Sequence, residues 1–170
     1  MKQVRTYAEL FKELEKQLFP IYQKALEHMK QILIDALNRL WFSRYQPALY
    51  ERTGDLINSL SIKQLKNSNG KFEALIYFDK DKIRQEHADF GGGYSFNIHM
   101  SLDGSTEYGG IDIGNWILIW LNEGSNSPYW SFPETGWYDD SLRVMQEDHE
   151  VAQFITKELR KIGITATVSW

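Results

Sequence analysis

The chain has 170 residues, 42% of them apolar and 14% aromatic, which suits the packed core of one domain over 1–170. Its net charge of −4, without a long run of Lys and Arg, argues against nucleic-acid recognition, which usually selects a basic face. The absence of cysteine excludes disulfides, thiolate zinc sites and cysteine nucleophiles. With no secretory signal and no apolar run near the ~20 residues that span a bilayer, we expect a soluble protein without a membrane partner.

The chain should begin with a long helix over 6–41. Thr6 and Glu9 form the pattern of a capping box, and apolar residues then recur at steps of three or four as far as Leu40. Pro20 should kink this helix or begin a second one. Unbroken, the helix would run ~54 Å at 1.5 Å per residue, too long to be buried within one small domain. We therefore expect it to bend at Pro20 or to lie partly against another subunit.

The next segment predicts a short helical turn followed by a hairpin. Thr53-Gly54-Asp55 is typical of a turn that opens a helical stretch ending at Leu60. Strands are expected over 61–66 and 71–79, because both show partial alternation and Asn69-Gly70 between them is typical of a hairpin turn.

A long glycine-rich loop, or an irregular extended hairpin, is expected over 80–114. Seven of the twelve glycines fall in 91–114, and loops of this length are often functional or disordered. Trp116–Leu121 predicts a buried strand or helical turn, and 122–133 predicts a second loop.

A second long helix is expected over 139–162, capped by Asp139 or Asp140. Gly163 stands where a C′ glycine ends a helix, and a β-branched terminal strand follows it. The fold class is therefore α+β, with the N-terminal and C-terminal helices packed on a small, mostly antiparallel sheet and joined by long loops.

Catalytic motifs are weak throughout the chain. His87 and Asp89 lack a second spaced pair that would complete a metal site. The carboxylates Glu134, Asp139 and Asp140 could form a glycosidase pair, but helix caps and solvated loop charges are the commoner case. We predict no catalytic residue, no cofactor and no metal.

Four tryptophans lie within 22 residues, from Trp116 to Trp137. Stacking on sugars or bases is one use for such a cluster. Core packing together with a subunit interface is the commoner use, because Trp and Tyr concentrate at interface hot spots.

The segment 45–60 carries a resemblance to a known family. Its sequence, Tyr-Gln-Pro-Ala-Leu-Tyr-Glu-Arg-Thr-Gly-Asp-Leu-Ile-Asn-Ser-Leu, resembles the Y-x-P-x-x-Y-x-R-T-G-x-L-x-x-S stretch of head–tail joining or tail-completion (neck) proteins of long-tailed bacteriophages and prophages. The later segment 119–125 is similar to an aromatic-aliphatic stretch of that family ending in Glu, Gly and a hydroxyl residue.

The resemblance implies a virion structural protein of the head–tail junction, made in the host cytoplasm. It implies a ring of six copies that docks on a connector or tail-tube protein, as tail completion protein, tail terminator or connector ring. DNA would pass through an acidic lumen without being read. The candidate interface residues are Arg52, Phe90, Tyr94, Phe96, Tyr129, Trp130, Phe132 and Trp137.

Two other functions stay open from the sequence. One is a carbohydrate-active or hydrolytic enzyme that uses the Trp-rich region as a substrate platform. The other is a small regulatory binding module, which would be a stable monomer or dimer with an apolar groove and no tendency to form rings.

Overall fold

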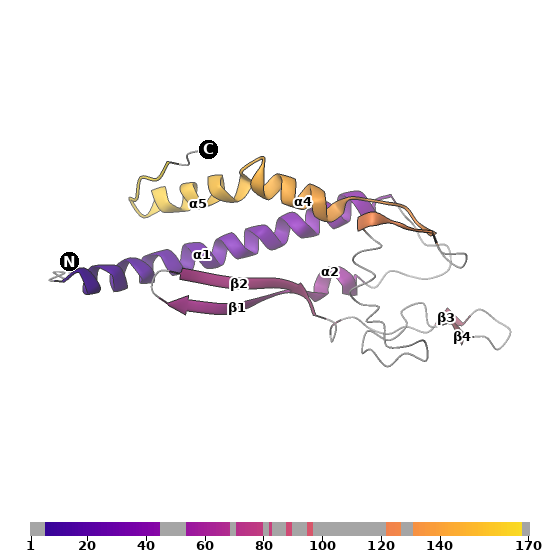
Figure 1. The fold of residues 1–170 in the computed structure, drawn as a ribbon, viewed down its shortest axis with the longest axis horizontal. Helices are drawn as coiled ribbons and strands as arrows, with labels where there is room; N and C mark the ends of the chain where they lie inside the picture. The colour runs from indigo at the N-terminus through magenta and orange to yellow at the C-terminus, as the bar shows by residue number, and fades with distance from the viewer. Residues whose placement is uncertain are drawn as a thin grey trace. The chain divides into compact units, whose positions relative to one another are not determined.

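The structure is a computed structural model, which describes residues 6–44, 54–68, 71–79, 82, 88–89, 95–96, 122–126 and 131–167. Long helices and a small antiparallel hairpin dominate these residues (Figure 1), so the predicted α+β class is confirmed. The chain divides into two compact units. Unit 1 comprises 1–32, 62–76 and 142–170, and unit 2 comprises 33–61 and 77–141. The single domain over 1–170 stays a prediction.

The leading helix α1 spans Tyr7–Leu37 and continues as a π-helical turn, η1, over Asn38–Phe42. Its capping box forms as predicted: the Glu9 amide donates to Thr6 Oγ1 at 3.2 Å, and the Thr6 amide donates to Glu9 Oε2 at 3.3 Å. These bonds satisfy two backbone groups that a helix start leaves without intrahelical partners.

Pro20 lies inside α1 and does not begin a second helix. Proline removes one backbone donor and crowds the preceding turn, which costs about 3 kcal/mol in a helix interior. Because Ile21 and Ala25 directly after Pro20 are buried, the packing of the following turns offsets this cost.

A short helix and a hairpin follow, close to their predicted positions. Helix α2 spans Asp55–Ser59, strand β1 spans Leu60–Ser68 and strand β2 spans Lys71–Phe78, and the two strands pair with each other. Gly54 stands at the N-cap of α2 with φ 76°, in the left-handed region that favours glycine. The predicted turn Asn69-Gly70 lies outside the described residues.

Two very short antiparallel pairs occur in the stretches predicted as loops. β3 (Ala88–Asp89) pairs with β4 (Ser95–Phe96), and β5 (Ser125–Asn126) pairs with β6 (Ser131–Phe132). The rest of the predicted loop 80–114 lies outside the described residues except for Lys82, as does Trp116–Leu121.

The helix predicted over 139–162 is divided into two. Helix α4 spans Trp137–Gln146 and α5 spans Glu150–Lys161, and between them His149 takes a left-handed conformation with φ 57°. The Arg143 carbonyl accepts from the Glu147 and Asp148 amides, and the Arg143 side chain pairs with the Asp148 carboxylate. These local contacts end α4, and an apolar pattern of helical period does not reveal them.

Helix α5 ends at the predicted glycine. Gly163 has φ 80°, its amide donates to the Arg160 carbonyl at 3.1 Å, and the Ile164 amide donates to the Leu159 carbonyl at 3.0 Å. This pair of bonds is the Schellman motif, in which glycine at C′ avoids the cost of a left-handed side-chain-bearing residue.

Each unit has its own buried apolar residues. Among the described residues of unit 1 they come from α1: Ile21, Ala25 and Ile32. In unit 2 they come from the end of α1, from η1, β1 and α4: Leu33, Ala36, Leu37, Leu40, Trp41, Leu60 and Trp137. No helix of the described part of the chain is long and apolar enough to cross a membrane.

Candidate interaction surface

Few of the interface residues predicted from the sequence fall where side chains are described. Phe96 lies in β4 and Phe132 in β6, where only the strand pairing is described. The following candidates lie outside the described residues: Arg52, Phe90, Tyr94, Tyr129 and Trp130. Of the eight, the structure therefore locates the side chain of Trp137 alone.

Trp137 is a buried residue of unit 2, and its part in an interface stays a prediction. Its side chain is only 3% exposed. Its ring meets Phe78 edge-to-face at 6.0 Å between centroids and lies 5.7 Å from the ring of Tyr138. A residue covered by its own chain has little surface left for a partner. The aromatic composition of the segment singled out Trp137. Its side chain is buried because α4 begins at this residue, which composition alone does not reveal.

Asn122 fixes the start of α4 and therefore the position of Trp137. Its carbonyl accepts from the amides of Thr135 and Gly136, and its side-chain Oδ1 accepts from the Tyr138 amide at 2.9 Å. Its Nδ2 donates to Asp139 Oδ2 at 3.0 Å. Asn122 belongs to the segment 119–125 that carries the second part of the family resemblance, and here it has a structural role.

Asp139 and Asp140 also have structural contacts. Asp139 accepts the hydrogen bond from Asn122, and Asp140 forms an ion pair with Arg39 of η1. Both carboxylates lie in the first turn of α4, where negative charge stabilises a helix through its dipole. The prediction that Asp139 or Asp140 caps the helix is wrong, because α4 begins at Trp137 and both acids lie inside its first turn, held by Asn122 and Arg39.

The C-terminal half of the signature-like segment has a physical explanation of its own. Ser59 is fully buried, and its Oγ donates to the Leu56 carbonyl at 2.7 Å. The Ser59 carbonyl accepts from the Asp79 amide at 2.8 Å and from Ser61 Oγ at 3.0 Å. A glycine before α2 and a serine at its end thus join the helix to the hairpin, as expected for a structural turn.

Three of the large exposed apolar residues of unit 1 lie together at the start of α1, whereas Leu65, Leu75 and Ile162 are exposed elsewhere in the unit. Tyr7 is 83% exposed, Phe11 66% and Leu10 41%. Scattered exposed apolar residues are ordinary, but these three lie at i, i+3 and i+4, on one face of the helix. We name Tyr7, Leu10 and Phe11 the leading ridge. Sequence reasoning missed Tyr7 and Phe11 as candidates, although their helical spacing was available.

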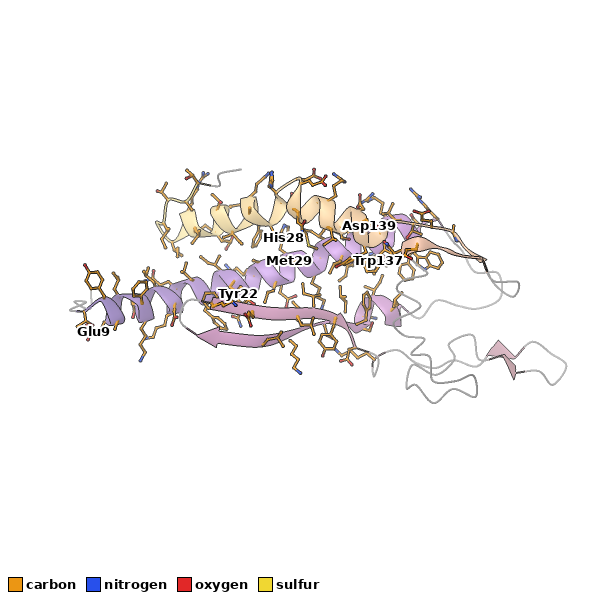
Figure 2. All side chains as sticks on the ribbon, viewed as in Figure 1. Glu9, Tyr22, His28, Met29, Trp137 and Asp139 are labelled. Carbon is orange, nitrogen blue, oxygen red and sulfur yellow. The ribbon has the colours of Figure 1, made fainter. Side chains whose placement is uncertain are left out.

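The leading ridge lies on the same face of α1 as the apolar residues that are buried further along the helix. In unit 1 the hairpin covers one side of the helix: Phe72 of β2 stacks on Tyr22 at 5.0 Å and lies 6.0 Å from Phe19. Partial burial, and to a smaller extent the nearby charge of Glu73, raise the pKa of Tyr22. Figure 2 labels Tyr22 beside the hairpin and Glu9 near the start of the helix.

Helix α5 covers another side of α1 in unit 1 through charged contacts. Glu158 is buried, accepts from Lys24 Nζ of α1 at 2.8 Å and pairs with Lys161 of its own helix. The hydrogen bond from Lys161, followed by that from Lys24, lowers the pKa of Glu158 to about 2. A buried carboxylate is tolerated because two ammonium groups neutralise it.

His28 makes the second contact between α1 and α5. Its ring stacks on Phe154 at 4.4 Å between centroids, and its Nε2 lies 3.3 Å from Glu150 Oε1. His28 is half-buried, and these contacts make it part of the helix packing.

Comparisons with known proteins found no match to a family model, a curated protein or a solved structure. The class of protein therefore has to be proposed from the chain's own residues.

Proposed function

We propose that this chain is a structural protein of the head–tail junction of a long-tailed bacteriophage or prophage. It would act there as tail completion protein, tail terminator or connector ring. The resemblance of segment 45–60 to the neck-protein signature suggests the kind of assembly. The buried Ser59 and the left-handed Gly54 give part of that pattern a reason, since both hold the turn between α2 and the hairpin.

The observation that carries the proposal is the exposed leading ridge on a helix whose continuation is buried. Tyr7 and Phe11 are mostly exposed, whereas Ile21, Ala25 and Ile32 of the same stripe are covered. Apolar surface that a chain leaves uncovered on a formed helix favours contact with another chain. An assembly protein requires such surface, because its work is to bind copies of itself and its neighbours.

In the virion the chain would form a ring of six copies that docks on a connector or tail-tube protein. The net charge of −4 would suit a lumen through which DNA slides, since like charges do not hold the phosphate backbone. DNA binding is therefore not expected to be sequence-specific or strong.

Native mass spectrometry with negative-stain microscopy tests this proposal. The purified chain is measured alone and after mixing with the connector or tail-tube protein encoded beside it. A ring, or a complex of fixed stoichiometry with either neighbour, is the expected result. A monomer under both conditions would contradict the proposal, and so would reading frames of metabolic enzymes in place of portal and tail-tube frames next to its gene.

A further inference from the structure

The leading ridge has the geometry of a surface that pairs with itself. At about 100° per residue, Tyr7, Leu10, Phe11 and the half-buried Leu14 fall within an arc of about 100° on α1. The four positions are symmetric about the midpoint between residues 10 and 11. In an antiparallel pair, Tyr7 of one copy therefore lies opposite Leu14 of the other, and Leu10 lies opposite Phe11. A second copy lying antiparallel therefore brings an apolar side chain against each of the four. We propose that the first turns of α1 form a two-fold contact between two copies of this chain in antiparallel orientation.

The charges beside the ridge favour this partner over others. Glu13 flanks the ridge on one side and Glu15 on the other, while Lys12 and Lys16 lie on the far face of the helix. An anionic membrane surface or a nucleic acid selects basic residues beside such a face, so acidic flanks disfavour both. The partner is therefore expected to be a protein.

The same charges select the orientation. A parallel second copy would place Glu13 of one helix on the same side of the pair as Glu15 of the other, and like charges there repel. It would also bring two helix N-termini together, with their positive dipole ends adjacent. In the antiparallel pair, Glu15 lies near Ala8 of the other copy and Glu13 near Thr6. Neither contact costs electrostatic energy.

The start of α1 is formed before any partner arrives. Thr6 and Glu9 cap it, and Glu13 pairs with Lys16 at 3.7 Å within the same turns. Figure 1 shows the first turns of α1 extending beyond the hairpin and α5 of unit 1. A helix that is already ordered loses little conformational freedom on pairing, which favours association.

The exposed area sets the strength of the contact. At roughly 200 Å² for a whole aromatic side chain, the exposed parts of Tyr7, Phe11 and Leu10 amount to roughly 350 Å² per copy. Stable interfaces bury about 800 Å² per partner. The pair is therefore a weak dimer that depends on concentration. It is also different from the proposed ring, since a ring of more than two copies needs two surfaces per copy and this contact uses one surface twice.

Sedimentation velocity of the full chain, from about 5 to about 500 μM, measures the dimer. We expect the wild type to move from monomer towards dimer over this range. The double variant Tyr7→Glu/Phe11→Glu should weaken the dimer at least about tenfold, because charges on the ridge would be buried in the pair. Leu65→Glu is the matched control, since it charges another exposed apolar residue of unit 1, and it should leave the dimer unchanged. A wild type that stays monomeric, or a control that weakens the dimer as much, would overturn the proposal.

The orientation is tested by cross-linking, which the cysteine-free chain allows without background. The single variants Tyr7→Cys and Leu14→Cys are oxidised separately and as a mixture. The antiparallel pair predicts the mixed disulfide between positions 7 and 14 in preference to a disulfide between two copies of Tyr7→Cys. The reverse preference would overturn the antiparallel arrangement. Loss of the dimer without loss of rings would separate this proposal from the proposed function.

Discussion

The contrast between two leucines of α1 gives a direct test of which part of the helix the chain covers. Leu37 is 0% exposed, whereas Leu10 is 41% exposed on the leading ridge. Truncating a fully buried leucine to alanine removes its transfer free energy and leaves a cavity, for which the usual cost is about 2–5 kcal/mol. We expect Leu37→Ala to lower the free energy of unfolding by about 3 kcal/mol. In a protein of this size that loss lowers the melting temperature by about 6–12 °C.

The matched variant Leu10→Ala makes the same chemical change in the same helix. It should alter the free energy of unfolding by no more than about 0.5 kcal/mol, because little packing is lost and alanine has a favourable helix propensity. Urea titration followed by circular dichroism, at a protein concentration low enough to keep the chain monomeric, gives both values. Equal losses for the two variants would refute the assignment of a covered and an uncovered part of α1.

Three further predictions concern the packing and the helix ends. Because the pKa of Glu158 is about 2 instead of an ordinary 4.5, its ion contacts add stability that is complete above about pH 4.5 and is lost as the pH falls towards 2. The stability difference between wild type and Glu158→Gln should therefore shrink over that window in acid titrations; a difference that stays constant across it would contradict these contacts. Gly163→Ala should cost about 1 kcal/mol in urea titration, since alanine is strained at φ 80° although no neighbouring atom blocks its Cβ; an unchanged stability would contradict the Schellman end of α5. Tyr22→Phe should raise the melting temperature, because the Tyr22 hydroxyl is buried without a hydrogen-bond partner in the described structure. Removing such a group relieves a cost of about 1–3 kcal/mol. A lower melting temperature would show that the hydroxyl has a hydrogen-bond partner.

Local signals in the sequence predicted three helix ends correctly. The capping box at Thr6 and Glu9, the short helix after Gly54 and the Schellman glycine Gly163 were each predicted and found. Each depends on a bond between residues at most five positions apart, so the residue types at fixed spacing contain the information.

The break between α4 and α5 and the burial of Trp137 could not be predicted in the same way. Residues 147–149 are polar, but apolar residues resume after them at helical spacing, so the period alone does not mark a break; the left-handed conformation falls on His149. Trp137 packs on Phe78, 59 positions earlier in the chain, and composition does not contain that contact. The sequence therefore identified the aromatic cluster, but it did not predict that Trp137 is buried.

The division of α1 into covered and uncovered turns follows from its contacts, because the periodicity is the same on both sides of Pro20. From Phe19 onward the helix meets Phe72 of the hairpin and Phe154 of α5, and its apolar face becomes buried. In the first turn of α1 the capping box stabilises the helix, and the exposed aromatic residues Tyr7 and Phe11 occupy its apolar face. Two exposed aromatic side chains add little to the stability of the monomer, which agrees with our proposal that Tyr7 and Phe11 act in a contact with a second copy. A first turn without apolar residues would fold equally well. Substitutions of Tyr7 and Phe11 should therefore change the proposed association of copies without changing the free energy of unfolding.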